Sequence, residues 1–164
     1  MTGATGNTAG DRDPSGGCQD EVSRLLVAAA YKLITRRYMP ERHQIGAALL
    51  DAAGGIHLGL HLDAMIGRAA ICAEAVALGA ARLAAETALV AIAAVRFPKP
   101  AEHGPARIVP PCGLCRELLL DYAPDLSVVI TAGGSIRRVP LAGLLPHKYA
   151  GTKWPAPVMP LGER

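Results

Sequence analysis

Residues 71–95 read ICAEAVALGAARLAAETALVAIAAV, and this stretch decides the fold class. Its first part, residues 71–86, carries apolar residues at helical spacing. Its second part, residues 88–95, is a run of small and β-branched residues that is typical of a fully buried strand. A helix that leads directly into a buried strand predicts an α/β domain.

The flanking segments complete this prediction. Residues 19–37 form a helix with acidic residues at its start and basic residues at its end, and residues 45–62 form two strands around a Gly-Gly turn. A Pro-rich loop over 97–111 leads into a short amphipathic helix over 112–122. Two strands follow, joined by Gly133 and Gly134, and they must be antiparallel because a parallel pair needs a long crossover. We expect a three-layer α/β/α sandwich with a mixed five-stranded sheet.

Length and terminal composition predict one folded domain. The 164 residues fit a flexible tail over 1–18, a domain over 19–155 and a C-terminal tail over 156–164. The N-terminus has no basic start and no apolar core of a secretory signal, and no apolar stretch reaches transmembrane length. Four cysteines without such a signal favour metal or redox chemistry in the cytoplasm over structural disulfides.

The charge distribution bears on the class of partner. The formal net charge is +3, and no long run of Lys or Arg is present. Nucleic-acid binding usually needs a basic stripe, often with interleaved aromatic residues. The sequence therefore favours a small-molecule substrate, with no nucleic acid and no membrane as partner.

Three cysteines form a candidate zinc site. Cys72 opens one predicted helix, while Cys112 and Cys115 open another in a C-x-x-C pattern. Helix N-termini lower thiol pKa and favour metal binding. Three protein ligands leave the fourth tetrahedral position for water, which is the mark of a catalytic zinc site. Glu74, two residues after Cys72, can reach over that water and transfer protons.

Two other readings of the cysteines stay open at this stage. The C-x-x-C pair can be a thioredoxin-type redox pair, although such a pair follows an early strand and this one comes late. The site can also be a closed structural zinc site, although no histidine has the short spacing to a cysteine that such sites show. Cys18 lies in or near the tail, and we expect it to take no part in the metal site.

Three thiolates and one divalent zinc sum to a net negative centre, which a nearby cation would balance. Arg116 and Arg68 are the candidates, and either can instead be a solvated surface charge.

The sequence resembles the cytidine deaminase superfamily over roughly residues 20 to 150, through its elements Cys72-Ala73-Glu74 and Pro111-Cys112-Gly113-Leu114-Cys115. IGAALLD, CRELL and LLPHKY are similar to its first strand, its C-R-Q-x-L element and its C-terminal segment. CAEAVALGAA looks closer to blasticidin-S deaminase-like members. The resemblance implies one Zn²⁺ per subunit and a homotetramer with active sites near subunit interfaces.

The resemblance also suggests substrate contacts. The family's ribose-binding N-V-E-N-A-S-Y segment is replaced here by residues 61–67, HLDAMIG. His61 and Asp63 can still bind a hydroxyl, or they are ordinary polar residues at a strand end. Ala73, His43 and Tyr149 fall at other positions that the resemblance assigns to the substrate. The Arg that usually follows C-A-E is Ala75 here, so the balancing charge must come from elsewhere.

The implied activity is hydrolytic deamination of a cytosine-type nucleoside, such as cytidine, deoxycytidine or blasticidin S, with release of ammonia. Three alternatives stay open: another aminated heterocycle as substrate, a base within RNA, and a zinc-stabilised binding protein without catalysis.

Overall fold

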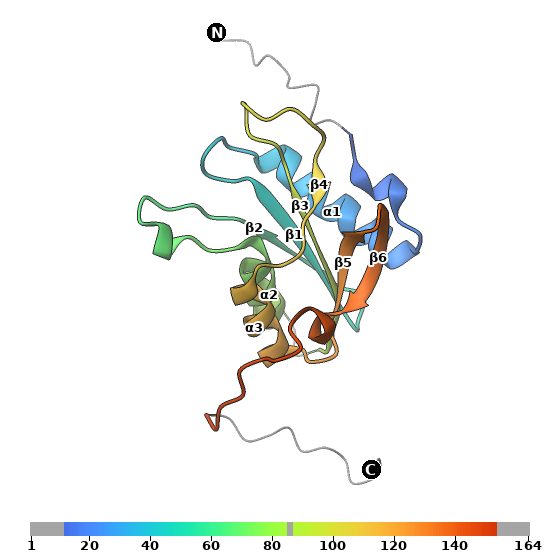
Figure 1. Cartoon of the computed structure of the whole chain (residues 1–164), viewed down its shortest axis with the longest axis vertical. Helices are drawn as coiled ribbons and strands as arrows, with labels where there is room; N and C mark the ends of the chain where they lie inside the picture. The colour runs from blue at the N-terminus through green and yellow to red at the C-terminus, as the bar shows by residue number, and fades with distance from the viewer. Residues whose placement is uncertain (1–11, 85–86, 154–164) are drawn as a thin grey trace.

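The computed structural model of the protein describes residues 12–84 and 87–153. Three α-helices and six strands make up this part of the chain (Figure 1). In chain order they are α1 (Glu21–Arg37), β1 (Ile45–Asp51), β2 (Ile56–Leu60), α2 (Ala73–Ala84), β3 (Leu89–Arg96), β4 (Arg107–Ile108), α3 (Gly113–Tyr122), β5 (Ser127–Ala132) and β6 (Ser135–Pro140). Short 3₁₀ turns occur at η1 (Pro14–Gly17), η2 (Gly67–Ala69) and η3 (Leu141–Leu144).

The strands form one mixed sheet in the order β2-β1-β3-β5-β6. β3 and β5 are parallel, whereas β1 pairs antiparallel with both β2 and β3. β5 and β6 are antiparallel, as predicted, and Gly133 and Gly134 between them have φ of +58° and +77°. Two successive positive φ values match the twist of a tight hairpin, which is why glycine is favoured at both positions.

The sheet has one strand more than the five we expected. β4 lies within the predicted Pro-rich loop and pairs antiparallel with the end of β3, with Val95 opposite Ile108 and Arg96 opposite Arg107. β4 consists of two residues, so no alternation of polar and apolar residues could reveal it from the sequence.

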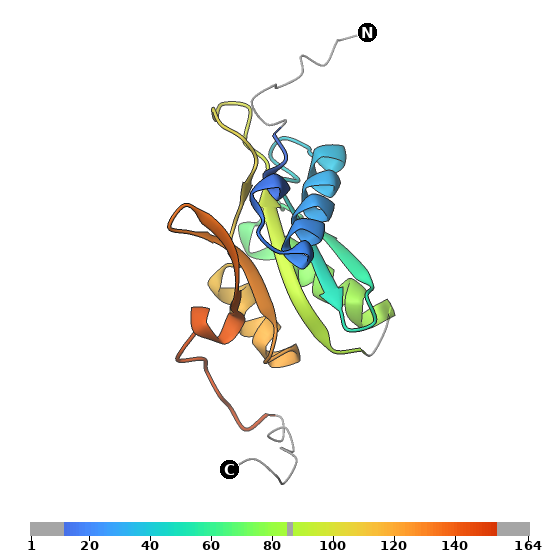
Figure 2. The same ribbon diagram turned by 90° about the vertical axis from the view of Figure 1, so that its right-hand side faces the viewer.

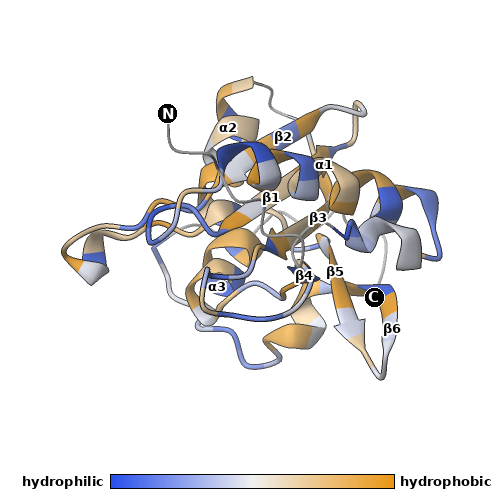
Figure 3. Ribbon diagram, turned by 90° about the horizontal axis from the view of Figure 1, so that it is seen from above, coloured by the Kyte–Doolittle hydropathy of each residue, from blue (hydrophilic) through white to orange (hydrophobic). Residues whose placement is uncertain are grey.

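The helices lie on both faces of the sheet, which confirms the three-layer architecture. α1 covers one face, and α2 and α3 cover the other (Figures 1 and 2). Successive strand residues serve opposite cores: Ala48 packs in the cluster under α1, and Leu49 packs in the cluster under α2 and α3. The central strands are strongly hydrophobic, whereas α1 alternates between hydrophilic and hydrophobic segments (Figure 3).

The end of the predicted N-terminal tail packs against the domain. Asp13 caps η1 by accepting a hydrogen bond from Ser15 N, and Pro14 occupies the first position of the turn. Cys18 is buried and forms a bridge to Ile136 on β6. Residues 1–11 of that tail and the predicted C-terminal tail 156–164 lie outside the described residues. No helix in the described ranges combines the length and hydropathy needed to cross a membrane.

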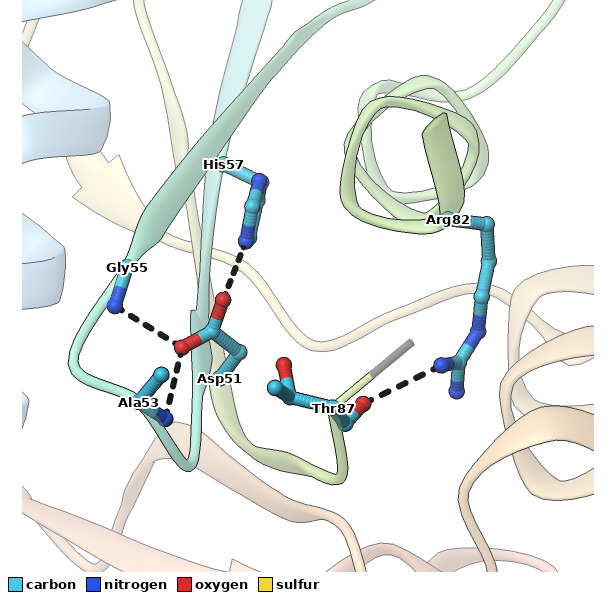
Figure 4. A network of polar contacts seen from close by, with 6 residues as sticks. All are labelled: Asp51, Ala53, Gly55, His57, Arg82 and Thr87. Atoms are coloured by element: carbon cyan, nitrogen blue, oxygen red, sulfur yellow. Dashed lines mark hydrogen bonds and ion pairs between the residues drawn. The ribbon is translucent and has the colours of Figure 1, made fainter. Parts of the chain in front are cut away.

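A polar network closes the β1–β2 hairpin (Figure 4). The Asp51 carboxylate is buried and accepts hydrogen bonds from Ala53 N and Gly55 N, at 2.9 and 2.8 Å. Its second oxygen lies 2.7 Å from His57 Nε2. The predicted Gly-Gly turn is therefore a four-residue connection over 52–55, organised by one aspartate.

Arg82 near the end of α2 connects three elements (Figure 4). Its guanidinium donates to the carbonyl of Thr87 before β3 and to the carbonyl of Tyr122 at the end of α3, both at 3.1 Å. These bonds fix the C-terminal end of α2 beside the sheet.

Candidate metal centre

Three cysteine side chains converge where α2 and α3 begin. The Sγ atoms of Cys72, Cys112 and Cys115 all lie within 4.8 Å of one another, and those of Cys72 and Cys112 are 3.6 Å apart. All three are free thiols, so a disulfide does not explain their proximity. The structure thus brings together the three residues that we predicted as metal ligands.

Local structure explains how residues 40 positions apart in the sequence reach one point. Cys72 immediately precedes α2, and its carbonyl accepts the hydrogen bond of Val76 N at 3.2 Å. Cys112 is the N-cap residue of α3, and Cys115 lies in the first turn of that helix. Because both helices start at the same edge of one sheet face, their positively polarised N-termini point toward the cluster.

Gly59 on β2 determines how closely α2 approaches the sheet. A Cβ at this position would lie 2.0 Å from the carbonyl oxygen of Ala73 and 2.4 Å from Ala77 N. Both contacts are with helix backbone, which cannot move aside as a flexible side chain does. The first turn of α2, which carries Glu74 next to Ala73, therefore rests directly on the strand backbone at this glycine.

The thiols differ in how readily they ionise. Burial raises the pKa of Cys115, and the nearby charges of Glu74, Cys72 and Cys112 raise it further. Burial also raises the pKa of Cys72. Burial acts in the same direction on Cys112, but the backbone N–H of Cys115 and the two neighbouring thiols outweigh it and lower the Cys112 pKa. Within the cluster, Cys112 therefore ionises more readily than an ordinary thiol, and Cys72 and Cys115 ionise less readily.

Glu74 is buried beside the cysteine cluster, with 5% of its surface exposed. Burial raises the pKa of its carboxyl group, although its own backbone N–H and the Cys115 thiol act in the opposite direction. A carboxyl group with a raised pKa holds a proton more readily than an exposed one does, which suits a general acid–base role.

The residues present fit a zinc ion. Zn–S bonds of about 2.3 Å in tetrahedral geometry place two sulfurs about 3.8 Å apart, close to the separation of Cys72 and Cys112. A divalent cation would also supply the positive charge that three crowded thiolates need. The group can therefore bind a metal ion without a large rearrangement of the backbone.

Two of the predicted substrate residues lie side by side at the ends of β1 and β2. His43 Nδ1 donates a hydrogen bond to the carbonyl of His61, at 2.9 Å. Nδ1 of His61 is buried and has no hydrogen-bond partner among the described residues. His61 lies two residues after Gly59, so the alternation of an extended chain directs it toward the same face as α2. This imidazole nitrogen is therefore a buried polar atom that the described residues leave without a hydrogen bond.

Asp63 lies at the rim of this region. It is exposed, and its backbone N–H donates to the carbonyl of Arg42 at 3.1 Å. This bond ties the segment after β2 to the turn before β1. Asp63 also lines a hollow of about 230 Å³ together with Glu41, Arg42, Ala64 and Met65.

The two predicted charge-balancing arginines have different surroundings. Arg116 donates to the carbonyl of Pro111, directly before Cys112, at 2.8 Å and to that of Leu144 at 2.9 Å. Arg68 is exposed in η2, on a segment that projects from the domain, and makes no polar contact to a described residue (Figure 1). Of the two arginines, Arg116 is therefore the one whose side chain contacts the segment directly before Cys112.

Tyr149 is held against α3 by its backbone. Tyr149 N donates to Glu117 at 3.3 Å, and the neighbouring Lys148 forms ion pairs with Glu117 and Asp121 at 3.3 and 2.7 Å. The Tyr149 side chain is 78% exposed, and no described residue of the substrate region contacts it through a hydrogen bond.

Two contacts were not predicted from the sequence. One is the close approach of α2 to the backbone of Gly59, and the other is the pair of ion pairs from Lys148 to Glu117 and Asp121 on α3. A glycine inside a strand pattern is a known sign of close backbone approach, so IHLGL held a usable signal. The ion pairs of Lys148 join residues far apart in the sequence, and no spacing rule predicts them.

Comparison with known proteins places these features in context. No family model matches the chain. Over 125 residues it is 41% identical to blasticidin-S deaminase of Bacillus cereus, which covers 76% of this chain and 89% of that protein. Over 129 residues it is 32% identical to cytidine deaminase of Halalkalibacterium halodurans, covering 77% and 92%. The crystal structure of cytidine deaminase from Mycobacterium tuberculosis matches with a TM-score of 0.63 and 25% identity, covering 80% of this chain and 99% of that chain.

Proposed function

This chain belongs to the cytidine deaminase-like superfamily, and we propose that it is a zinc-dependent hydrolytic deaminase acting on cytosine-type nucleosides. The observation that carries the proposal is the cluster of Cys72, Cys112 and Cys115 with the buried carboxyl group of Glu74 beside it. A thiol cluster that served folding alone would have no need for a buried, protonatable carboxyl group next to it.

In this proposal the three cysteines hold the metal ion, and Arg116 stabilises the loop that presents Cys112. When bound there, zinc lowers the pKa of a coordinated water toward neutrality and so supplies the nucleophile. The hydrogen bond from Arg116 to the carbonyl before Cys112 would help to orient that ligand.

Glu74 moves the protons. Its carboxylate takes one from the attacking water and delivers it to the ring nitrogen next to the carbon under attack. It then takes the remaining proton from the newly added hydroxyl group and passes it to the amine, which leaves as ammonia as the C–N bond breaks, and a carbonyl product remains. Burial of Glu74 keeps bulk water from competing for this proton, and it raises the pKa of the carboxyl group.

His61 and Asp63 form the proposed contact with the sugar, and His43 is the proposed contact with the base. The unpartnered Nδ1 of His61 offers one hydrogen bond, and the exposed carboxylate of Asp63 accepts another from a hydroxyl group. The side chain of Tyr149 is free to serve a neighbouring subunit, which fits the homotetramer implied by the family resemblance. We place the protein in the cytoplasm, where its thiols stay reduced.

Blasticidin S is the favoured substrate within this class. The identity to blasticidin-S deaminase is 41%, compared with 32% to cytidine deaminase. The segment at residues 61–67 also departs from the ribose-binding pattern, as a modified sugar would require. Cytidine is the second candidate, because His61 and Asp63 can still bind hydroxyl groups.

The test is ammonia release from the zinc-loaded protein with blasticidin S, cytidine, deoxycytidine and cytosine, and with guanine as an outgroup. We expect the highest kcat/KM with blasticidin S. Release from cytidine alone would assign the protein to nucleoside salvage instead. Full zinc occupancy with no release from any of these substrates would contradict the proposed substrate class.

A further inference from the structure

A groove on the α1 face of the sheet lies apart from the cysteine cluster. α1 packs over β1 and β3, and the edge strand β2 is left partly open beside it. The resulting hollow has a volume of about 390 Å³, which is within the range of small-molecule sites. Its lining comes from one stripe of α1 and from alternate residues of β2: Ala29, Lys32, Leu33, Arg36, Arg37, Ile56 and Leu58.

The floor of the groove is apolar. Ile56 and Leu58 point to the α1 face, whereas Gly59 packs against α2 on the opposite face. Leu58 is 43% exposed although it lies in the sheet, because α1 leaves part of β2 uncovered on this face. Leu33 and Ala29 extend this apolar surface onto the helix.

Every charged residue that lines the groove is a cation. The side chains of Lys32, Arg36 and Arg37 make no ion pair or hydrogen bond to a described residue, and no acidic residue lines the hollow. The helix dipole favours cations in the last turn of α1, and Arg36 and Arg37 lie there. Lys32 lies more than one turn before the end of the helix, so the dipole does not account for it.

From this arrangement we propose that the groove is a binding site for a small organic anion with an apolar body. Charge complementarity requires the anionic group, and the aliphatic floor requires an apolar body that leaves water on binding. A second copy of the chain placed groove to groove would bring two sets of three cations together, which disfavours self-association there. This proposal does not depend on the deaminase activity.

The probe is octanoate, which combines a carboxylate with a chain short enough for the groove. When octanoate is titrated into the ¹⁵N-labelled, zinc-loaded protein, the amide chemical shifts in NMR spectra should change in a saturable way, and only at residues 29–37 and 56–58. Octan-1-ol has the same chain without the charge, and acetate has the charge without the chain. Each should bind at least about tenfold more weakly than octanoate, since each lacks one of the two contributions.

Two sets of matched variants locate the site. The triple variant Lys32→Gln, Arg36→Gln, Arg37→Gln should weaken octanoate binding at least about tenfold. The variant Lys99→Gln, Arg107→Gln, Arg137→Gln removes the same charges from exposed positions outside the groove and should bind as the wild type does. Equal binding by the two triple variants would overturn the proposal. Shifts outside the groove, or octan-1-ol binding as tightly as octanoate, would also overturn it.

Discussion

The two ends of α2 handle buried polar groups in opposite ways. At the C-terminal end, Arg82 donates to two carbonyls, and nearby Asp51 accepts three hydrogen bonds from its own hairpin (Figure 4). At the N-terminal end, burial raises the pKa values of Glu74, Cys72 and Cys115, and nearby acidic groups raise those of the two thiols further. The Asp51 carboxylate is thus satisfied by its own hairpin, although Arg82 Nε and Thr87 Oγ1 beside it have no hydrogen-bond partner among the described residues. The acidic groups at the N-terminal end suit the metal ion that we propose there.

This contrast distinguishes structure from function within a single helix. A buried charge that finds its partners within the fold stabilises the fold. A buried acidic group that is crowded with others costs folding free energy, and such costs are typical of functional sites. The following variants test whether the two ends of α2 differ in this way.

The largest effect is expected at Cys115. Cys115→Ser removes a thiolate ligand from the proposed metal centre, so zinc should be lost and turnover should fall at least about 1000-fold. Zinc content by mass spectrometry and ammonia release measure the two effects separately.

Cys18→Ser is the matched control, because Cys18 is also buried but lies outside the cluster. It should keep one zinc ion per chain. If both serine variants retain zinc equally, the three-cysteine site is not the metal site.

A smaller effect is expected where the N-terminal turn of α2 rests on the sheet. Gly59→Ala would place a Cβ against the Ala73 carbonyl, so the helix must shift and kcat should fall about 10- to 100-fold. The Co²⁺-substituted protein should show an altered visible spectrum, since the shift moves Cys72 relative to Cys112 and Cys115.

Gly79→Ala provides the comparison within the same helix. A Cβ at Gly79 meets nothing within 4 Å, and alanine stabilises a helix by up to about 1 kcal/mol relative to glycine. This variant should keep the Co²⁺ spectrum and gain thermal stability. A Gly59→Ala protein with the wild-type spectrum and kcat would show that the close contact does not position the site.

The smallest effect on activity is expected at the C-terminal end, where the role is stability. There the Asp51 carboxylate accepts hydrogen bonds from His57 and Gly55, and these bonds hold the pKa of Asp51 below its ordinary value of 3.8. A depressed pKa means that the carboxylate stabilises the fold above pH 3.8 and that this contribution is lost as the pH falls through the lower, folded-state value. Asp51→Asn should therefore lower the melting temperature by about 5 °C or more at pH 7 and leave kcat nearly unchanged.

The pH dependence sharpens this prediction. The difference in melting temperature between wild type and Asp51→Asn should shrink below about pH 4. Asp125→Asn changes an exposed aspartate and should show little difference at any pH. A difference for Asp51→Asn that does not change down to pH 2 would contradict the role of the ionised carboxylate.

The sequence predicts most of the fold because each long element has a strong local signal. The helical spacing in 71–86, the two glycines at 133–134 and the acidic-to-basic order in 19–37 all act within one element. The short strand β4 and the four-residue turn organised by Asp51 depend on tertiary contacts, which local patterns do not contain.

The candidate metal centre could be predicted from the sequence more fully than the proposed substrate region, for the same reason. Cys72, Cys112 and Cys115 come together because two helix N-termini meet, and the C-x-x-C spacing indicates half of that geometry. The pairing of His43 with His61, and the exposure of Tyr149, follow from how loops pack on the sheet. Those contacts have no spacing rule, so the sequence alone could only suggest them.

The most direct test of the account is the turnover of Glu74→Gln, measured with its zinc content on blasticidin S and cytidine. Glutamine keeps the size of the side chain but cannot carry the proton, so we expect full zinc occupancy and at least about a 1000-fold loss of kcat. Glu102→Gln, which alters a glutamate paired with Arg96 away from the cysteines, should keep nearly wild-type turnover. Near wild-type turnover by zinc-loaded Glu74→Gln would contradict the proposed role of Glu74 and with it the account of this site.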